Sequence, residues 1–448
     1  MSGGLQGSFL EDIVAHVDDD TPRLVYADWL TENGQDDRAE FIRVQVERAR
    51  LPVWDPGQVR LRVRERQLLA AHGEEWLAEM PAIKGVRWEG FRRGIVAEVS
   101  FASYEAMRTT APAVRAAAPI EAVTVHWPSR GERRALPIAE LRELVLTGRP
   151  YDEEVAWLAD SPQLSTLRSL TVLGLAVEDL TRLTASPHLG GLRVLRLPSN
   201  GLGNAGVRAL TQAATLTALE EIDLTGPGYY ASYYDDPIIN VPGAEALASW
   251  PGLATVRTLT LTGSDVRRNG LRALLQSPYN GSLKVLSLRS GRLDPQAVAA
   301  FRDARDGLRL EALDLGDNAL KEPGVIHLAS AKCLSELRAL LLDRCELPAS
   351  APASGWRRRG FSTPCGAEPR SQPPRPDGPG RPAASSVRRR STCCICATTT
   401  SPRGSGATSR SPASDGLLEL DVSGNRLGVA TRGGWARRRT CAACRCCG

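Results

Sequence analysis

Two motifs in this 448-residue sequence have residue types and spacings that could carry out chemistry. The segment Gly201-x-Gly203-x-x-Gly206 matches a dinucleotide-binding fingerprint, in which glycines let the backbone approach a pyrophosphate group closely. The pairs Cys393-x-x-Cys396 and Cys441-x-x-Cys444 have the spacing of four thiolate ligands of a zinc ion. If both motifs were functional, the chain would bind a nucleotide cofactor and a structural metal.

The surroundings of both motifs argue against that chemistry. The glycine motif lies inside one copy of a sequence repeat, which accounts for its strand, its turn and its helix without a cofactor. The cysteine pairs flank another copy of the same repeat in an Arg-rich region. Neither a Gly-Lys-Ser/Thr phosphate loop nor a His-Glu-x-x-His metal motif occurs, and the five histidines are scattered. We therefore expect no enzyme activity, no catalytic residue, no cofactor and no metal.

A pattern of the form Leu-x-x-Leu-x-Leu recurs along most of the chain. Successive copies are spaced by 25 to 27 residues, except for one interval of 37, and weaker copies begin at Val96 and Ile120. A fixed period in this range is typical of a solenoid of stacked repeats. The eight clear copies begin at Leu141, Leu167, Leu192, Leu219, Val256, Leu283, Leu310 and Leu337.

Each copy has the parts of a strand–turn–helix unit. The alternating leucines predict a short strand with its apolar side chains on one face. Asn200 or Asn318 follows the strand, where an asparagine can satisfy backbone groups at a bend. An amphipathic helix such as 206–210 or 324–329 comes next, and neighbouring units must stack because one unit cannot bury both faces. The array, residues 96–348, resembles the ribonuclease-inhibitor class of leucine-rich repeats.

The side chains between the strand leucines are expected on the concave surface of such a solenoid. They form a strip of mixed charge without a basic, aromatic-rich stripe, which disfavours specific nucleic-acid binding. A protein partner fits this strip better, and a merely solvated face is the alternative. The strip consists of Arg196, Asp223, Thr260, Ser287 and Asp314, with Arg289 and Asp343 beside it.

The interval of 37 residues contains an insertion of about ten residues, within 226–237. Insertions in solenoids lie at the edge of one face, often the binding face. This one holds four of the chain's eight tyrosines, and tyrosine brings contact area at a low cost in side-chain entropy. A plain surface loop is the alternative to a binding loop. The binding candidates here are Tyr229, Tyr230, Tyr233 and Tyr234.

Residues 1–52 have the pattern of a small helical module. Thr21-Pro22 is a suitable helix start. The module resembles the repeat-companion domain of planctomycete and myxobacterial proteins in Phe9-Leu10, in Asp-Thr-Pro-Arg-Leu-Val-Tyr-Ala-Asp-Trp-Leu (20–30) and in Arg-Ala-Glu-Phe-Ile-Arg (38–43). That family has no assigned activity and typically precedes repeat arrays. Residues 53–95 are predicted to form a helical linker that caps the array.

The composition limits the classes of protein to which this chain can belong. No run of 18 apolar residues occurs, so no transmembrane helix is expected, and the N-terminus lacks the features of a secretory signal. The first 350 residues contain only two of the ten cysteines and have a net charge of −7. This cysteine usage is typical of a reduced, cytoplasmic protein, for which we expect no membrane association.

The region after residue 348 departs from the pattern. Residues 351–416 contain no leucine, and residues 351–448 carry 17 arginines against five acidic residues. One complete repeat copy returns at 417–428, about three periods after Leu337. Because the spacing is kept while the composition changes, our hypothesis is that 349–416 and 429–448 are read out of frame. A disordered Arg/Pro-rich linker within the array is the alternative.

These patterns predict an α/β leucine-rich repeat solenoid, a horseshoe, with a small N-terminal all-α module and a disordered Arg/Pro/Cys-rich C-terminal region. The expected function is a scaffold that binds an unknown protein partner through the concave face and the Tyr-rich insertion. One alternative is a GTPase-activator-like regulator, because such arrays also look like the Ran GTPase-activating proteins. Another is a non-functional product of a frameshifted gene. The binding candidates are the four tyrosines with Arg196, Asp223, Arg289 and Asp314.

Sequencing the coding DNA across codons 340–448 tests the frame hypothesis. We expect another frame to encode leucine-rich repeats that begin near residues 364 and 391, because the 80 residues from Leu337 to Leu417 leave room for two further copies. If neither of the other frames contains a leucine pattern, the hypothesis is wrong and the Arg-rich segment is a genuine part of the protein.

Overall fold

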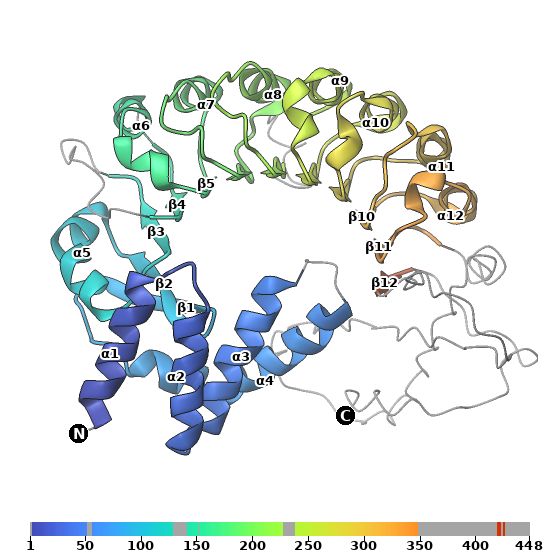
Figure 1. Ribbon diagram of the computed structural model, residues 1–448. Coiled ribbons are helices and arrows are strands. Elements are labelled where there is room, and N and C mark those ends of the chain that lie inside the picture. The colour runs from blue at the N-terminus through green and yellow to red at the C-terminus, as the bar shows by residue number, and fades with distance from the viewer. Residues whose placement is uncertain are drawn as a thin grey trace, which may run out of the picture.

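The computed structural model describes residues 2–51, 56–128, 141–150, 152–226, 238–347, 419–422 and 424–425. Within these ranges, four helices are followed by a long arc of strands and helices (Figure 1). Tyr229, Tyr230, Tyr233 and Tyr234 lie outside the described residues. Both cysteine pairs and both segments of the frame hypothesis also lie outside them.

The N-terminal helices pack around a small apolar core of their own. Pro22 lies in the first turn of α2, where its missing N–H costs no helical hydrogen bond. Gly34 follows α2 with φ +75°, a left-handed conformation that glycine adopts without strain. Ile13, Tyr26 and Leu30 are among the buried core residues. The helices are α1 (Ser2–Ala15), α2 (Thr21–Glu32), α3 (Asp36–Arg50) and α4 (Pro56–Ala78).

Part of the predicted helical linker 53–95 is a β-hairpin instead. Residues after α4 form β1 (Val86–Arg92), which pairs antiparallel with β2 (Ile95–Phe101). Side chains at the start of β1 alternate between partly buried and exposed positions, as in a half-buried strand. Arg93 and Gly94 both have positive φ at the turn, which matches the twist of a two-residue hairpin. A hairpin therefore opens the array.

From β2 onward, the strands of the described chain run parallel, each beside its neighbour in sequence order. This gives eleven parallel strands among the described residues, joined edge to edge without closing into a barrel. After β2 come β3 (Ala122–His126), β4 (Glu143–Thr147), β5 (Ser169–Val172), β6 (Val194–Arg196), β7 (Glu221–Asp223), β8 (Thr258–Thr260), β9 (Val285–Ser287), β10 (Ala312–Asp314), β11 (Ala339–Leu341) and β12 (Glu419–Asp421).

Helices cover the outer side of the arc, and the strands line its inner side (Figure 1). The layer contains α5 (Tyr104–Ala117), α6 (Asp152–Ala159), α7 (Val177–Thr184), α8 (Gly203–Thr211), α9 (Val241–Ser249), α10 (Arg267–Gln276), α11 (Pro295–Val298) and α12 (Lys321–Ala329). Short 3-10 turns complete it: η1 (Pro162–Thr166), η3 (Pro251–Ala254), η4 (Asn280–Ser282), η5 (Ala299–Asp303) and η6 (Lys332–Leu334). No helix in the described ranges is long and apolar enough to cross a membrane.

One continuous apolar core runs between the strands and the helices. The middle residue of each central strand is buried and pairs in register with the middle residue of the next, as Leu195 does with Ile222 and Leu259 with Leu286. Full burial of one such side chain contributes roughly 1.5–3 kcal/mol. The architecture is therefore an open α/β solenoid whose core is built from the periodic leucines.

Asparagines hold successive turns together, as the sequence predicts. Asn318 is 2% exposed; its side-chain oxygen accepts from Leu293 N at 2.9 Å, and its Nδ2 donates to three carbonyls, including that of Leu288 at 3.0 Å. Asn200 makes the equivalent bonds to Leu175 N and to the Val172 carbonyl, both at 2.8 Å. Each asparagine thus satisfies backbone groups of the preceding repeat.

The isolated repeat copy near the C-terminus stacks directly on the last regular repeat. β12 pairs in register with β11, so that Leu340 lies beside Leu420. Asn425 accepts from the amides of Cys345 and Leu347 at 2.7 and 3.0 Å and donates to the Leu342 carbonyl at 2.8 Å. The copy therefore continues the ladder although 77 residues separate β11 from β12 in the sequence.

Replacing Asn318 by alanine tests the role of the asparagine bonds. We expect a loss of roughly 3 kcal/mol in unfolding free energy, because the substitution leaves buried backbone groups without partners. Denaturant unfolding measures the total loss in unfolding free energy, and amide hydrogen exchange at Leu293 reports the lost hydrogen bond directly. Asn200→Ala, at a half-buried site with fewer bonds, is the control and should lose less. Unchanged exchange at Leu293 in the Asn318 variant contradicts the assigned role.

Candidate functional site: the concave face of the sheet

The side chains between the strand leucines form one column across the inner face. Register pairing places Arg196 beside Asp223, Asp223 beside Thr260, Thr260 beside Ser287 and Ser287 beside Asp314. All five are partly exposed, whereas the leucines that alternate with them are buried. Adjacent strands lie roughly 4.8 Å apart. The strip predicted from the sequence is thus a continuous row on a rigid sheet.

Arg196 of β6 is held by Glu221 on the adjacent strand β7 and by Glu143 on β4, two strands away. Its Nε donates to Glu221 Oε1 at 2.7 Å, and its Nη1 lies 3.8 Å from Glu143 Oε1. The side chain is 34% exposed. Neither glutamate is among the residues selected from the sequence, because they occupy the other outward position of their strands. The charge of Arg196 is therefore partly neutralised within the sheet.

Asp223 and Asp314 share a structural role at the ends of their strands. Oδ1 of Asp223 accepts from Thr225 N at 2.8 Å, and Oδ1 of Asp314 accepts from Gly316 N at 2.9 Å. Both bonds close a turn two residues after the aspartate. Asp223 makes no ion pair with any residue in the described ranges, so its carboxylate carries uncompensated negative charge on the strip.

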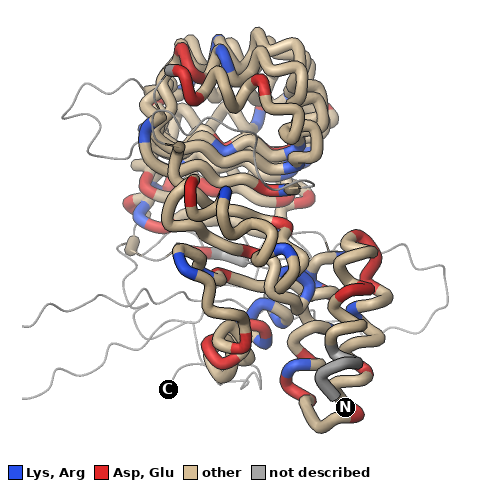
Figure 2. Tube along the Cα trace, turned by 90° about the vertical axis from the view of Figure 1, so that its left-hand side faces the viewer, with Lys and Arg blue, Asp and Glu red and all other residues tan. Residues whose placement is uncertain are grey.

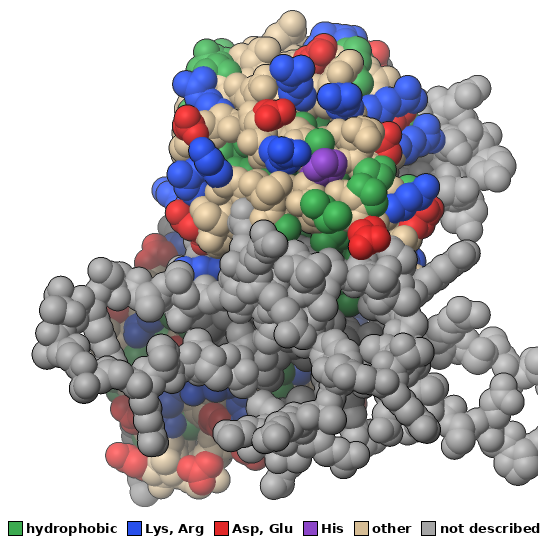
Figure 3. All heavy atoms as spheres, turned by 90° about the vertical axis from the view of Figure 1, so that its right-hand side faces the viewer, with side chains coloured by type: hydrophobic (Ala, Val, Ile, Leu, Met, Phe, Trp, Pro, Cys, Tyr) green, Lys and Arg blue, Asp and Glu red, His purple; other side chains and the backbone are tan. Residues whose placement is uncertain are grey.

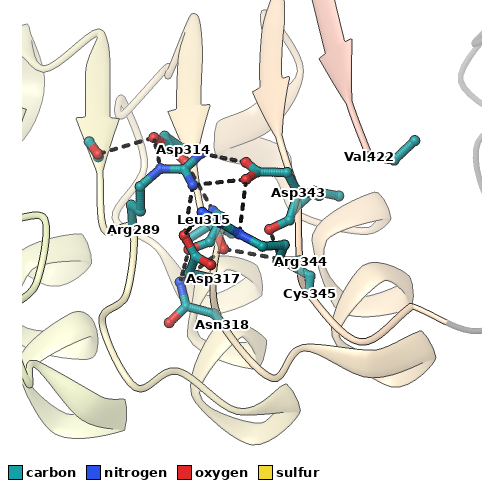
Figure 4. Close-up of polar contacts among 12 residues, drawn as sticks. Arg289, Asp314, Leu315, Asp317, Asn318, Asp343, Arg344, Cys345 and Val422 are labelled. Carbon is teal, nitrogen blue, oxygen red and sulfur yellow. Dashed lines mark hydrogen bonds and ion pairs between the residues drawn. The ribbon is translucent and has the colours of Figure 1, made fainter. Parts of the chain in front are cut away.

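Arg289 is the centre of an ionic network on the C-terminal half of the face (Figure 4). Its guanidinium donates to Asp314 at 3.0 Å, to Asp317 at 2.9 Å and, through two nitrogens, to Asp343. Arg344 donates to Asp317 at 2.5 Å from the next repeat. Two cations thus face three carboxylates, and the network joins three successive repeats.

Gly316 makes the long reach of Arg289 possible. The guanidinium crosses the repeat of β10 to reach Asp343 on the following repeat, and a Cβ at position 316 would come within 2.4 Å of its Nη2. Any larger residue there would move the Arg289 side chain. The sequence pattern places Arg289 and Asp343 on the strip, but the absence of a side chain between them becomes meaningful only in the structure.

The network shifts the ionisation of its members. Hydrogen bonds from Arg289 lower the pKa of Asp343 below its usual value, and the surrounding carboxylates raise the pKa of Arg289. Burial raises the pKa of the nearby Cys345 thiol to about 12. Cys345 therefore stays protonated, and its Sγ donates to the Leu315 carbonyl at 3.1 Å, in the place where other repeats have an asparagine.

The charged groups of the concave face mainly contact one another and the backbone. Its carboxylates close turns or neutralise arginines, and in the described part of the chain no group of three His, Cys, Asp or Glu residues is placed to hold a metal. The glycine motif 201–206 forms the turn into α8, as the repeat requires. The sequence pattern did not identify four charged residues that take part in the ion pairs of this face: Glu143, Glu221, Asp317 and Arg344.

The N-terminal helices are fixed to the edge of the sheet where β3 and β4 begin (Figures 1 and 2). Arg23 of α2 is fully buried; its Nη1 donates to the Asp19 carbonyl at 2.9 Å, and its Nη2 lies 3.6 Å from Glu121. Arg93 also donates to Glu121, at 3.0 Å. Because a buried charge needs a partner, these ions tie the helices to the first repeats.

The fold is an open α/β solenoid with eleven parallel strands in the described residues. No family model and no curated protein matches the chain. Among solved structures, the Rad7–Elc1 complex in yeast is similar at 12% identity and a TM-score of 0.34, over 73% of this chain and 80% of that one. An internalin (inlF) from Listeria monocytogenes str. 4b F2365 is similar at 15% identity and a TM-score of 0.19, over 53% and 84%. Likenesses this distant carry no argument about function.

Asp343→Asn tests the contribution of the ionic network. Because the pKa of Asp343 is lowered in the folded state, its stabilisation is present above pH ~4 and is lost as the pH falls below its folded pKa. We expect the variant to be less stable by about 2 kcal/mol at pH 7, and the difference to shrink below pH ~4.

Denaturant unfolding of both proteins between pH 3 and pH 7 measures this difference. Asp303→Asn is the control, because Asp303 is exposed and makes no ion pair with a described residue. A stability difference for Asp343→Asn that does not change with pH would show that the carboxylate charge is not the cause.

Proposed function

We propose that this protein is a scaffold that binds a protein partner on the concave face of its solenoid. The observation that carries the proposal is the unbroken, in-register column from Arg196 to Asp314, presented on a sheet that a continuous core makes rigid. A rigid row of polar groups loses little entropy on binding, so that more of its contact energy appears as affinity.

The distribution of charge also supports the concave face. In the view of Figure 3, acidic and basic side chains are interspersed over the outer surface. On the concave face, by contrast, Asp223 lacks a cation and the Arg289 network carries more carboxylates than cations. A partner segment with exposed lysine or arginine side chains complements this arrangement.

The Tyr-rich insertion, within residues 226–237, follows β7 in the sequence. Gly226, its first residue, follows β7 by three positions and donates from its backbone N to the Thr262 carbonyl at 2.8 Å. The four tyrosines follow Asp223 within eleven residues of sequence. We keep them as aromatic anchors at the margin of the binding surface, since tyrosine is enriched among residues that dominate binding energy.

We infer that the N-terminal helices are a repeat-companion module whose first role is to cap the array. The buried Arg23 that contacts Glu121 lies within the segment that carries the resemblance. The GTPase-activator alternative has no observation in its favour, because Arg196 is engaged by Glu143 and Glu221.

Thr260→Arg tests the proposed surface. Thr260 lies in the middle of the column, half-exposed, so a large cation there should block the partner while the fold remains. We expect at least a tenfold loss of partner capture from extracts of the source cells, with the melting temperature unchanged within a few degrees. Replacing all four tyrosines by serine should also weaken capture.

Glu245→Arg on the outer side of α9 is the matched control, because Glu245 is exposed and makes no ion pair with a described residue. It should leave capture unchanged. Equal capture by the wild type and by Thr260→Arg would exclude the concave face as the binding surface, and equal loss in the Glu245 variant would show that added charge alone is responsible.

A further inference from the structure

A cavity lies at the edge of the sheet where the strands begin, away from the concave column. It has a volume of about 650 Å³ and opens between the end of α1 and the segments that lead into β3–β6. Volumes in this range are typical of small-molecule sites. None of its lining residues belongs to the concave strip, so it forms a second, separate candidate site.

One wall of the cavity is cationic. Arg142, Arg168 and Arg193 each directly precede a strand, and these strands pair in register. The three residues therefore follow one another at strand spacing, roughly 4.8 Å. Arg115, in the last turn of α5, adds a fourth guanidinium to the lining. The repeat thus lines up arginines that are distant in the sequence.

In the described ranges, carboxylates pair with only two of these four arginines, and Glu121, which also lines the cavity, pairs with Arg23 and Arg93 instead. Asp18 accepts two hydrogen bonds from Arg142, and Glu220 accepts from Arg193 at 2.6 Å. Between them, Arg168 donates, among the described residues, to the backbone carbonyls of Leu167 and Gly191 alone, at 3.3 and 3.4 Å. Neither Arg168 nor Arg115 makes an ion pair with a described residue. The centre of the wall therefore has an excess of positive charge, which favours a bound anion.

Another part of the lining is apolar. It consists of Val14 in the last turn of α1, Val17 just after this helix, and Pro119 and Ile120 before β3, with Asp18 and Glu121 next to them in the sequence. Val14 is 43% exposed, whereas its neighbour Ile13 is buried in the core of the helical module. Covering such a side chain with an apolar group removes its surface from water, which favours binding. The cavity thus offers separate places for an anionic group and an apolar group.

We propose that this cavity binds an organic phosphate. The phosphate group lies between Arg168 and Arg115, because guanidinium groups form paired hydrogen bonds to phosphate oxygens and lose little hydration in doing so. The apolar part of the ligand packs on Val14, Val17 and Ile120. Since Val14 of α1 and the arginines of the repeats line the same cavity, the site exists only where the helical module meets the array.

Calorimetric titration of the full chain with three probes tests whether both the cationic and the apolar part of the lining contribute to binding. 1-Naphthyl phosphate has the anionic and the apolar group, inorganic phosphate has only the first, and 1-naphthol only the second. We expect 1-naphthyl phosphate to bind at least tenfold more tightly than either of the others, and to bind more weakly as the salt concentration rises. Equal affinity for 1-naphthol or for inorganic phosphate overturns the proposal.

The variant Arg115→Gln/Arg168→Gln locates the binding. It should weaken 1-naphthyl phosphate binding at least tenfold. Arg257→Gln is the matched control, because Arg257 occupies the same repeat position before β8, is exposed and lies outside the cavity. It should leave the affinity unchanged. Equal affinity of the double variant and the wild type, or an equal loss in the control, overturns the assignment.

Gly191→Ala tests the position of Arg168 without removing its charge. A Cβ at position 191 would come within 2.7 Å of Arg168 Nη1, the mobile end of a long side chain, so the guanidinium should move while the fold is kept. We expect a three- to tenfold weaker affinity for 1-naphthyl phosphate. An unchanged affinity with an unchanged melting temperature contradicts the proposed position of the phosphate group between Arg168 and Arg115.

Discussion

A single repeat cannot bury its own leucines, and the rest of the structure depends on this constraint. The strand of one unit covers its neighbour only if the two pair in register, as Leu195 and Ile222 do. In-register pairing then fixes every other position of the repeat as well. The outward residues become the concave column, and the residues before the strands become an edge that collects Arg142, Arg168 and Arg193. Both candidate sites are consequences of the same stacking.

Many polar groups of the array stabilise the fold, and this role limits how far they are available to bind a partner. Asn318 satisfies backbone groups of the preceding repeat, and Asp223 and Asp314 close the turns after their strands. Arg289 joins three repeats through Asp314 and Asp343. Under the proposed function, binding energy on the concave face would come from groups that are only partly engaged and are already held in place by the fold.

The sequence predicts the features that depend on the period. The strands, the asparagine bonds and the concave column follow from counting positions in each repeat. Features that depend on contacts between different repeat positions are not visible in that count. Arg289 reaches Asp343 only because Gly316 has no side chain, and Arg23 contacts Glu121 across nearly a hundred residues of sequence. The hairpin of β1 was also missed, because its alternation is short and weak beside the strong helical pattern before it.

The reading frame of the C-terminal region affects the length of the array but not its binding surfaces. In the chain as written, β12 pairs directly with β11, whereas two restored repeats would lie between these strands. A restored repeat would pair with β11 through the same kind of backbone hydrogen bonds as β12 does, because every repeat has a strand at this position. The concave column from Arg196 to Asp314 and the cavity around Arg168 lie before β11, and their contacts are made within the first 347 residues. The two proposed sites therefore lie in the part of the chain that does not depend on the reading frame of the C-terminal region.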